Sequence, residues 1–180
     1  YTIHRIFFEL IKIYYLTYSL ALAVFAGVFL IASKSEASQS VNEEDRYCLA
    51  QNIYFEAGNQ PFAGKLAVAH VTLNRVFDLQ FPNDICGVVY QTKEYRKSWT
   101  GEMVPKRGMC QFSWYCDGKS DEPKDSLTWI EAIRVADIAM QDTTFDLTDG
   151  ALWYHADYVL PYWAQHLEYV LQIENHIFYK

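Results

Sequence analysis

Residues 48–76 read CLAQNIYFEAGNQPFAGKLAVAHVTLNRV, which is two helical patterns joined by a polar turn. The first helix is expected to end near Ala57, because the residues that follow, 58–61, are strong helix breakers. The second helix is predicted from apolar residues at spacings of three and four, which are Phe62, Leu66, Ala69, Leu73 and Val76. This pattern predicts one carboxylate, Glu56, in the last turn of a helix that meets a second, packed helix.

The remaining sequence predicts a single compact α+β domain without internal repeats. We expect residues 78–125 to be rich in loops, with a mobile flap within residues 92–108. A third helix is expected to start at a capping box of Thr128 and Glu131. Its predicted core-facing residues are Leu127, Ile130, Ile133, Ala136 and Ala139 or Met140. A short closing β-hairpin is predicted from Tyr169, Leu171 and Ile173, a turn at Glu174 and Asn175, and then Ile177 and Tyr179.

The N-terminal segment carries no charged residue from position 13 to position 33. A hydrophobic helix of this length can span a bilayer or act as a long secretory signal. Small residues allow signal-peptidase cleavage after Ala37, so both a signal peptide and a retained membrane anchor stay open for residues 1–37. In either case we expect residues 38–180 to form an exported domain in a periplasmic or extracellular location.

The chain is acidic, with a formal net charge of −7. Without residues 1–37 it keeps 12 basic and 20 acidic residues, which gives −8. This balance argues against nucleic acid as a partner, because nucleic-acid-binding surfaces are basic. We expect a monomer whose only membrane contact is through its N-terminal segment.

The four cysteines are Cys48, Cys86, Cys110 and Cys116. An even number in an exported chain favours disulfides, and three pairings are possible. We favour Cys48 with Cys86 and Cys110 with Cys116, while buried free thiols are the alternative. A zinc site at Cys110 and Cys116 is disfavoured, because their spacing differs from the close C-x-x-C arrangement that brings two thiolates to one metal.

Several stretches, in this order along the chain, resemble one known family. They are NIYFEA with the following GKLAVAHVTLNRV, FPNDICGVVYQ at 81–91, CQFSWYCDG at 110–118, DGALWYHADYVLPYWA at 149–164 and the terminal HIFYK. Together they resemble the SleB/CwlJ-like cell-wall hydrolases, the spore cortex-lytic-like peptidoglycan hydrolases, over residues 45–180. The resemblance implies a lysozyme-like arrangement and peptidoglycan as the substrate, and we expect neither a cofactor nor a metal. Many relatives read EARGE where this chain reads EAGNQ, a change that leaves Glu56 in place.

Glu56 is the predicted catalytic residue. Cleavage of a glycosidic bond needs a carboxylic acid that stays protonated near neutral pH, and burial beside Tyr54 and Phe55 would raise the pKa of Glu56 in this way. The sequence identifies no second carboxylate; Asp45, Asp78, Asp117 and Asp157 are candidates by residue type alone. The resemblance implies lytic transglycosylation, in which one Glu acts as acid and then as base while the muramic acid 6-hydroxyl attacks the anomeric carbon.

Five further residues are predicted to bind the substrate, namely Asn52, Gln111, Ser113, Tyr154 and His155. Amides and hydroxyls suit the N-acetyl and hydroxyl groups of the sugars, and Trp114 and Tyr115 could stack on sugar rings. Asn74 and Arg75 are expected to hold the fold together, and His176 to belong to the terminal hairpin.

Two other functions stay open at this point. One is an N-acetylmuramoyl-L-alanine amidase, which generally needs zinc, although the histidines lack H-E-x-x-H-like spacing. The other is a wall-binding module without catalysis. The sequence fits both a phage endolysin and a bacterial enzyme of wall remodelling.

Overall fold

The computed structural model describes residues 43–141 and 145–180, which belong to one compact unit, Glu43–Lys180. The predicted anchor at residues 13–33 and the cleavage site after Ala37 lie outside the described residues. None of the helices within residues 43–141 and 145–180 has the length and hydrophobicity of a membrane span. The content of helices and strands confirms the α+β prediction.

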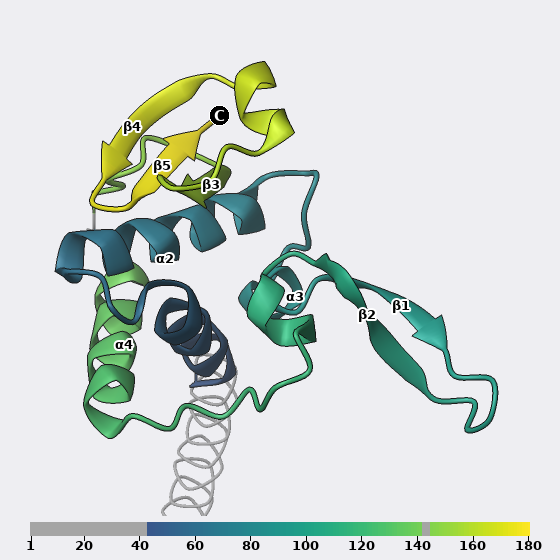
Figure 1. Cartoon of the computed structure of the whole chain (residues 1–180). Coiled ribbons are helices and arrows are strands. Elements are labelled where there is room, and N and C mark those ends of the chain that lie inside the picture. The colour runs from purple at the N-terminus through teal and green to yellow at the C-terminus, as the bar shows by residue number, and fades with distance from the viewer. Residues whose placement is uncertain (1–42, 142–144) are drawn as a thin grey trace, which may run out of the picture. The chain divides into compact units, whose positions relative to one another are not determined.

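Helix α2 (Phe62–Phe77) lies between two hydrophobic clusters. Leu66 and Ala69 belong to the larger cluster, as the sequence predicted, whereas Ala67 and Val71 pack in a second one. Figure 1 shows the C-terminal sheet along one side of α2, with helix α4 on the other side. A helix with apolar residues all round is buried on most sides. The prediction of a single apolar face was therefore incomplete, and Phe62, placed in the core by that prediction, is 45% exposed.

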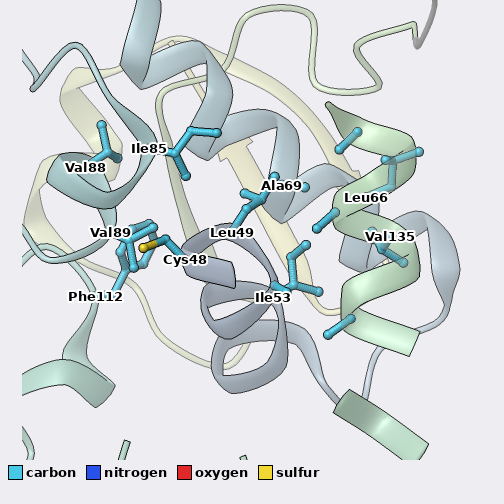
Figure 2. Packing of buried hydrophobic residues seen from close by; sticks show 14 of the residues in the cluster. Cys48, Leu49, Ile53, Leu66, Ala69, Ile85, Val88, Val89, Phe112 and Val135 are labelled. Carbon is cyan, nitrogen blue, oxygen red and sulfur yellow. The ribbon is translucent and has the colours of Figure 1, made fainter. Parts of the chain in front are cut away.

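The larger cluster joins α2 to the helical residues 43–57, to α3 (Ile85–Val89) and to α4 (Ser126–Ala139). Leu49 and Ile53 are fully buried, and Figure 2 shows them near the middle of the cluster. Each such side chain contributes about 2 kcal/mol through burial. The first helix is thus fixed along its length, and it ends at residue 57 as predicted.

Helix α4 begins earlier than predicted. Its N-cap is Asp125, whose carboxylate accepts a hydrogen bond from the Thr128 amide at 2.7 Å, so Thr128 lies in the first turn and is not the cap. The buried face consists of Ala132, Val135, Ala136 and Ala139. Leu127 and Ile130 were predicted in the core but are 77% and 62% exposed. The alanines let α4 approach its neighbours closely, which leaves these larger residues outside.

The predicted flap is an ordered β-hairpin, so the expectation of loops was wrong for this segment. Strands β1 (Thr92–Arg96) and β2 (Met103–Cys110) are antiparallel, with Arg96 opposite Met103 and Glu94 opposite Pro105. Most residues of both strands are exposed, so the sequence lacks the alternation of apolar and polar residues that marks a half-buried strand. A short 3-10 helix, η1 (Ser113–Cys116), follows β2.

The C-terminal part is a three-stranded antiparallel sheet in the order β3-β5-β4. Strands β4 (Tyr169–Ile173) and β5 (His176–Tyr179) form the predicted hairpin, and His176 begins β5. Strand β3 (Trp153–Ala156) was not predicted; it pairs with β5 and is followed by a 3-10 helix, η2 (Tyr162–His166). Phe178 of β5 is fully buried against α2, which fixes the sheet on the helix.

Both favoured disulfides are present, Cys48–Cys86 and Cys110–Cys116, so the pairing is confirmed and no cysteine is free. The first joins the helical residues 43–57 to α3, and the second joins the end of β2 to η1. Each therefore holds a segment that leads into the region around Glu56.

We expect the two disulfides to contribute unequally to stability. The bonded cysteines are 38 residues apart in the first pair and 6 apart in the second. Chain entropy gives a loss in the free energy of unfolding of about 4 kcal/mol for Cys48→Ala with Cys86→Ala, and of about 2 kcal/mol for Cys110→Ala with Cys116→Ala. Urea denaturation of the two double variants measures both values. An equal or larger loss from the short loop would contradict this expectation.

Candidate active site

Glu56 lies in the last turn of its helix and lines a pocket of about 250 Å³. The other lining residues are Arg75, Gln111, Phe112, Ser113, Trp153, Tyr154 and Trp163. They come from α2, from the segment after β2, from β3 and from η2. The pocket therefore joins residues that are far apart in the chain around one carboxylate, and it combines polar groups with aromatic rings.

The Glu56 carboxyl group is held by Tyr154. The Tyr154 hydroxyl donates a hydrogen bond to Glu56 Oε2 at 3.0 Å. Burial raises the pKa of Glu56 above its ordinary value, while this hydrogen bond and the positive charge of Arg75 oppose the rise. Burial and the negative charge of Glu56 also raise the pKa of Tyr154 well above its ordinary value, so its hydroxyl stays a donor. Burial thus shifts Glu56 toward its protonated form, and the hydrogen bond from Tyr154 leaves Oε1 for another partner.

Tyr54 and Phe55, which the sequence predicted to surround the Glu56 carboxyl, are not among the lining residues of its pocket. Phe55 stacks on Trp114 with the ring centroids 4.7 Å apart and meets Tyr54 edge-on at 4.9 Å. Trp114 is only 7% exposed and belongs to the larger cluster. The prediction of Trp114 as a sugar platform was therefore wrong, because its faces are used in core packing.

Arg75 is the cation of the pocket, and its side chain is only 3% exposed. The guanidinium lies over the rings of Phe81 and Phe112, at 5.3 and 5.1 Å from their centroids. Its Nε donates to the Leu152 carbonyl at 2.8 Å. The side-chain amide of Gln111 is assigned with its oxygen toward Arg75, where Oε1 accepts from Nη1 and Nη2 at 3.2 Å each. Burial lowers the pKa of Arg75 to about 10, so the group stays charged at neutral pH.

The structure brings three of the predicted binding residues to Glu56, namely Gln111, Ser113 and Tyr154. Asn52 and His155 are not among the lining residues. Asn52 is fully buried; its Nδ2 donates to Thr72 Oγ1 at 3.1 Å, and its Oδ1 accepts from the Trp114 indole at 3.1 Å. This geometry gives Asn52 a role in fixing the helix of Glu56 and leaves its side chain out of reach of a substrate in the pocket.

His155 is held within the C-terminal sheet. Its imidazole hydrogen-bonds the Ala156 carbonyl at 2.9 Å and the Tyr179 hydroxyl at 3.0 Å, and it is only 7% exposed. Its neighbours in β3, Tyr154 and Ala156, are half-buried, whereas His155 is buried. Tyr154 reaches Glu56, whereas His155 supports the strand that carries Tyr154.

Sequence reasoning missed four lining residues, which are Arg75, Phe112, Trp153 and Trp163. Trp153 and Trp163 stand within the stretch that carried the family resemblance, but both are half-buried, and the sequence does not distinguish them from the other aromatic residues of that stretch. Arg75 was expected to support the fold, and its contact with Leu152 agrees with that role. Its second role, beside Glu56, had no signal in the sequence because it depends on which side of α2 meets the pocket.

Glu56 is the only carboxylate among the described residues that line this pocket. The four aspartates considered as a second carboxylate, Asp45, Asp78, Asp117 and Asp157, are not part of the lining. In the described part of the chain, no group of three or more His, Cys, Asp or Glu side chains is arranged to hold a metal ion.

Gly58 is the first position at which this chain, EAGNQ, differs from EARGE, and its surroundings leave no room for a side chain. A Cβ atom at this position would lie 2.5 Å from the Tyr54 carbonyl oxygen and 3.0 Å from Thr128 Cγ2 of α4. The turn after Glu56 therefore packs against α4 more closely than a side chain at position 58 allows.

The family model described as Cell Wall Hydrolase matches residues 59–179, beginning three residues after Glu56. The chain is 26% identical over 145 residues to the spore cortex-lytic enzyme of Oceanobacillus iheyensis, which covers 79% of this chain and 44% of that protein. It is 40% identical over 50 residues to the spore cortex-lytic enzyme of Bacillus subtilis, which covers 28% of this chain and 16% of that protein. This chain thus spans less than half the length of these curated relatives.

Two solved structures are similar to the described fold. The catalytic domain of the Bacillus cereus SleB protein has a TM-score of 0.54 at 24% identity, covering 77% of this chain and 91% of that one. The catalytic domain of the germination-specific lytic transglycosylase SleB from Bacillus anthracis has a TM-score of 0.51 at 26% identity, covering 76% of this chain and 93% of that one. The described fold therefore corresponds to nearly the whole of these catalytic domains.

We expect Glu56→Gln to stabilise the protein at high pH. A carboxyl group whose pKa is raised by folding favours the folded state fully below its unfolded pKa, and this contribution is lost as the pH rises through the folded pKa. The neutral amide does not incur that loss. Calorimetry at about pH 8 should show a higher Tm for the variant by a few degrees, about 4 °C for each kcal/mol in a domain of this size.

At about pH 4, where the ordinary glutamate is largely protonated, the two proteins should melt together. The exposed Glu168 provides the control, since Glu168→Gln should leave Tm unchanged at both pH values. A Glu56→Gln variant that is less stable than wild type at high pH would contradict the raised pKa.

Proposed function

This chain belongs to the Cell Wall Hydrolase family, and from this we propose that it cuts the glycan strand of peptidoglycan between N-acetylmuramic acid and N-acetylglucosamine by lytic transglycosylation. The observation that carries the proposal is the single half-buried carboxylate of the pocket, Glu56, whose pKa burial raises. A hydrolase of the usual kind employs two carboxylates, whereas an intramolecular attack requires one.

In the first step, Glu56 acts as the general acid. Tyr154 occupies Oε2, so Oε1 carries the proton to the glycosidic oxygen. The bond between the muramic acid C1 and that oxygen breaks, and the electron pair stays with the oxygen of the leaving N-acetylglucosamine. Positive charge develops at C1, and Glu56 becomes a carboxylate.

In the second step, the Glu56 carboxylate acts as the general base. The 6-hydroxyl of the same muramic acid attacks C1, and its proton goes to Glu56, which restores the starting acid. The product ends in 1,6-anhydromuramic acid, and no water is consumed. Proximity within one sugar replaces the second carboxylate that would otherwise activate water.

Arg75 balances the charge of Glu56 between these steps. Its buried guanidinium favours the carboxylate that exists only after the first proton transfer. Because Phe81, Phe112 and Leu152 hold the guanidinium, this stabilisation needs no rearrangement during the reaction. Arg75 also orients the Gln111 amide, which leaves the Gln111 NH₂ group to donate to an acceptor in the pocket, such as a sugar N-acetyl carbonyl.

The remaining lining residues suit a sugar ligand. Trp153 and Trp163 supply aromatic surface for sugar rings, and Ser113 supplies a hydroxyl for a polar sugar group. We extend the proposal to a lysozyme-like arrangement of the domain 38–180 and to its export, with residues 1–37 as a signal peptide or membrane anchor. The similar catalytic domain from Bacillus anthracis belongs to a germination-specific lytic transglycosylase, which supports the proposed reaction.

Mass spectrometry of the products released from purified peptidoglycan tests this function. The wild-type chain should release fragments with 1,6-anhydromuramic ends, both with and without a metal chelator. Glu56→Gln should reduce the rate by roughly 10²- to 10⁴-fold, because general acid and base catalysis are both lost.

Other products would contradict the proposal in distinct ways. Reducing muramic acid ends would indicate hydrolysis by water, and free stem peptides that disappear with the chelator would indicate a zinc amidase. A wild-type chain that binds peptidoglycan but releases nothing would indicate a binding module.

A further inference from the structure

The β1–β2 hairpin carries a charge opposite to that of the rest of the domain. Residues 92–110 contain five basic and two acidic residues, whereas the other residues of the unit 43–180 contain seven basic and eighteen acidic ones. The hairpin thus has a formal net charge of +3 beside a body of −11. An anionic polymer is repelled by the body and attracted to the hairpin.

The basic side chains divide into those used by the hairpin itself and those that are free. Lys97 pairs with Glu102 at 2.9 Å, and Arg96 donates to the Gly101 carbonyl at 2.7 Å near the turn. Lys93 and Lys106 are exposed and make no side-chain hydrogen bond or ion pair with the described residues. Arg107 is also exposed; its charge acts on Asp117, but no side-chain hydrogen bond or ion pair with the described residues holds it, so a partner can reach three cations.

Exposed apolar side chains accompany these cations. Trp99 at the turn is 78% exposed, Tyr95 is 47% exposed, and Met103 and Met109 are 46% and 44% exposed. Tyr95 is opposite Val104 in the register, and the pairing becomes irregular between Pro105 and Cys110, the part of β2 that contains Lys106 and Arg107. Aromatic rings beside cations suit a ligand that combines sugar rings with acidic groups.

The hairpin starts and ends at the edge of the Glu56 pocket. Gln111, which lines the pocket, directly follows β2, and its backbone N–H donates to the Gln91 carbonyl at 2.8 Å across the base of the hairpin. The Cys110–Cys116 disulfide joins the end of β2 to η1, which contains the lining residue Ser113. Figure 1 shows the hairpin extending from this base away from the helices. Its direction is therefore fixed relative to the pocket.

We propose that the β1–β2 hairpin binds the carboxylate-bearing stem peptides of peptidoglycan next to the sugar held in the pocket. This inference rests on the proposed function, because it assigns a second contact to the same substrate. Lys93, Lys106 and Arg107 pair with stem-peptide carboxylates, while Tyr95 and Trp99 contact neighbouring apolar or sugar surfaces. The hairpin thereby brings an acidic enzyme to an acidic polymer.

Binding to intact sacculi tests the proposal without requiring cleavage. The 180-residue chain with Glu56→Gln serves as the parent, and the test variant adds Lys93→Gln, Lys106→Gln and Arg107→Gln. At about 50 mM salt we expect roughly tenfold weaker binding of the test variant, as three exposed charge contacts together allow. The difference should shrink at about 500 mM salt, where exposed charges are screened.

A matched control variant adds Lys119→Gln, Lys124→Gln and Arg134→Gln to the same parent, all at exposed positions outside the hairpin. It removes the same formal charge and should bind as the parent does. Sacculi whose stem-peptide carboxyls have been amidated should bind the parent as weakly as the test variant. Equal losses from the test and control variants, or unchanged binding to amidated sacculi, would overturn the proposal.

Two further arms separate the alternatives. Hairpin-dependent binding to vesicles of anionic phospholipid, without hairpin-dependent binding to sacculi, would assign the hairpin to a membrane and overturn the proposal. The three hairpin substitutions in the chain with Glu56 intact should leave cleavage of short, peptide-free glycan unchanged. Slower cleavage of this glycan by the variant would show that the hairpin acts on the pocket itself, which would also overturn the proposal. Failure of the wild type to cut any glycan would overturn the proposed function alone.

Discussion

The polar side chains near the C-terminal end of α2 hold together the separate walls of the pocket. Apolar packing on both sides fixes the helix itself, so these side chains have defined positions. Thr72 accepts a hydrogen bond from Asn52, which lies in the helix of Glu56. Asn74 donates to Asp146, to Thr148 and to the Ala151 carbonyl. Arg75 donates to the Leu152 carbonyl and to Gln111. One buried helix thereby determines where the Glu56 helix, β3 and the segment after β2 meet. Because each of these hydrogen bonds is buried or half-buried, removing one side chain leaves the other polar group without a hydrogen-bond partner, which lowers the stability of the fold.

The environment of Glu56 combines opposing effects that suit a group used first as an acid and then as a base. Burial favours the neutral acid, whereas the Tyr154 hydroxyl and the Arg75 charge favour the carboxylate. A site with burial alone would hold the proton too firmly, and a site with strong pairing alone would never be protonated near neutral pH. Since Tyr154 and Arg75 are themselves fixed by packing, the balance belongs to the folded structure and does not depend on a mobile group.

The sequence predicted those features that depend on local signals. Helix breakers after Ala57 fixed the position of Glu56, and the motif around Gln111 and Ser113 led to two residues of the lining. The β1–β2 hairpin was missed because its exposed faces leave no periodic pattern, and the exposure of Leu127 was missed because α4 packs through its alanines. The role of Arg75 beside Glu56 depends on tertiary packing alone. From the sequence, a basic residue within a core helix fits a purely structural role equally well.

The ionisation of the Glu56 carboxyl group is the most direct test of this account. A carbon-13 NMR titration of that carboxyl in the folded chain should give a midpoint above the ordinary glutamate value, because burial dominates. In Tyr154→Phe the midpoint should rise further, because the carboxylate loses a hydrogen bond that stabilises it. A midpoint at or below the ordinary value in the wild type would contradict the account, because Glu56 would then be ionised at neutral pH and unable to donate the proton.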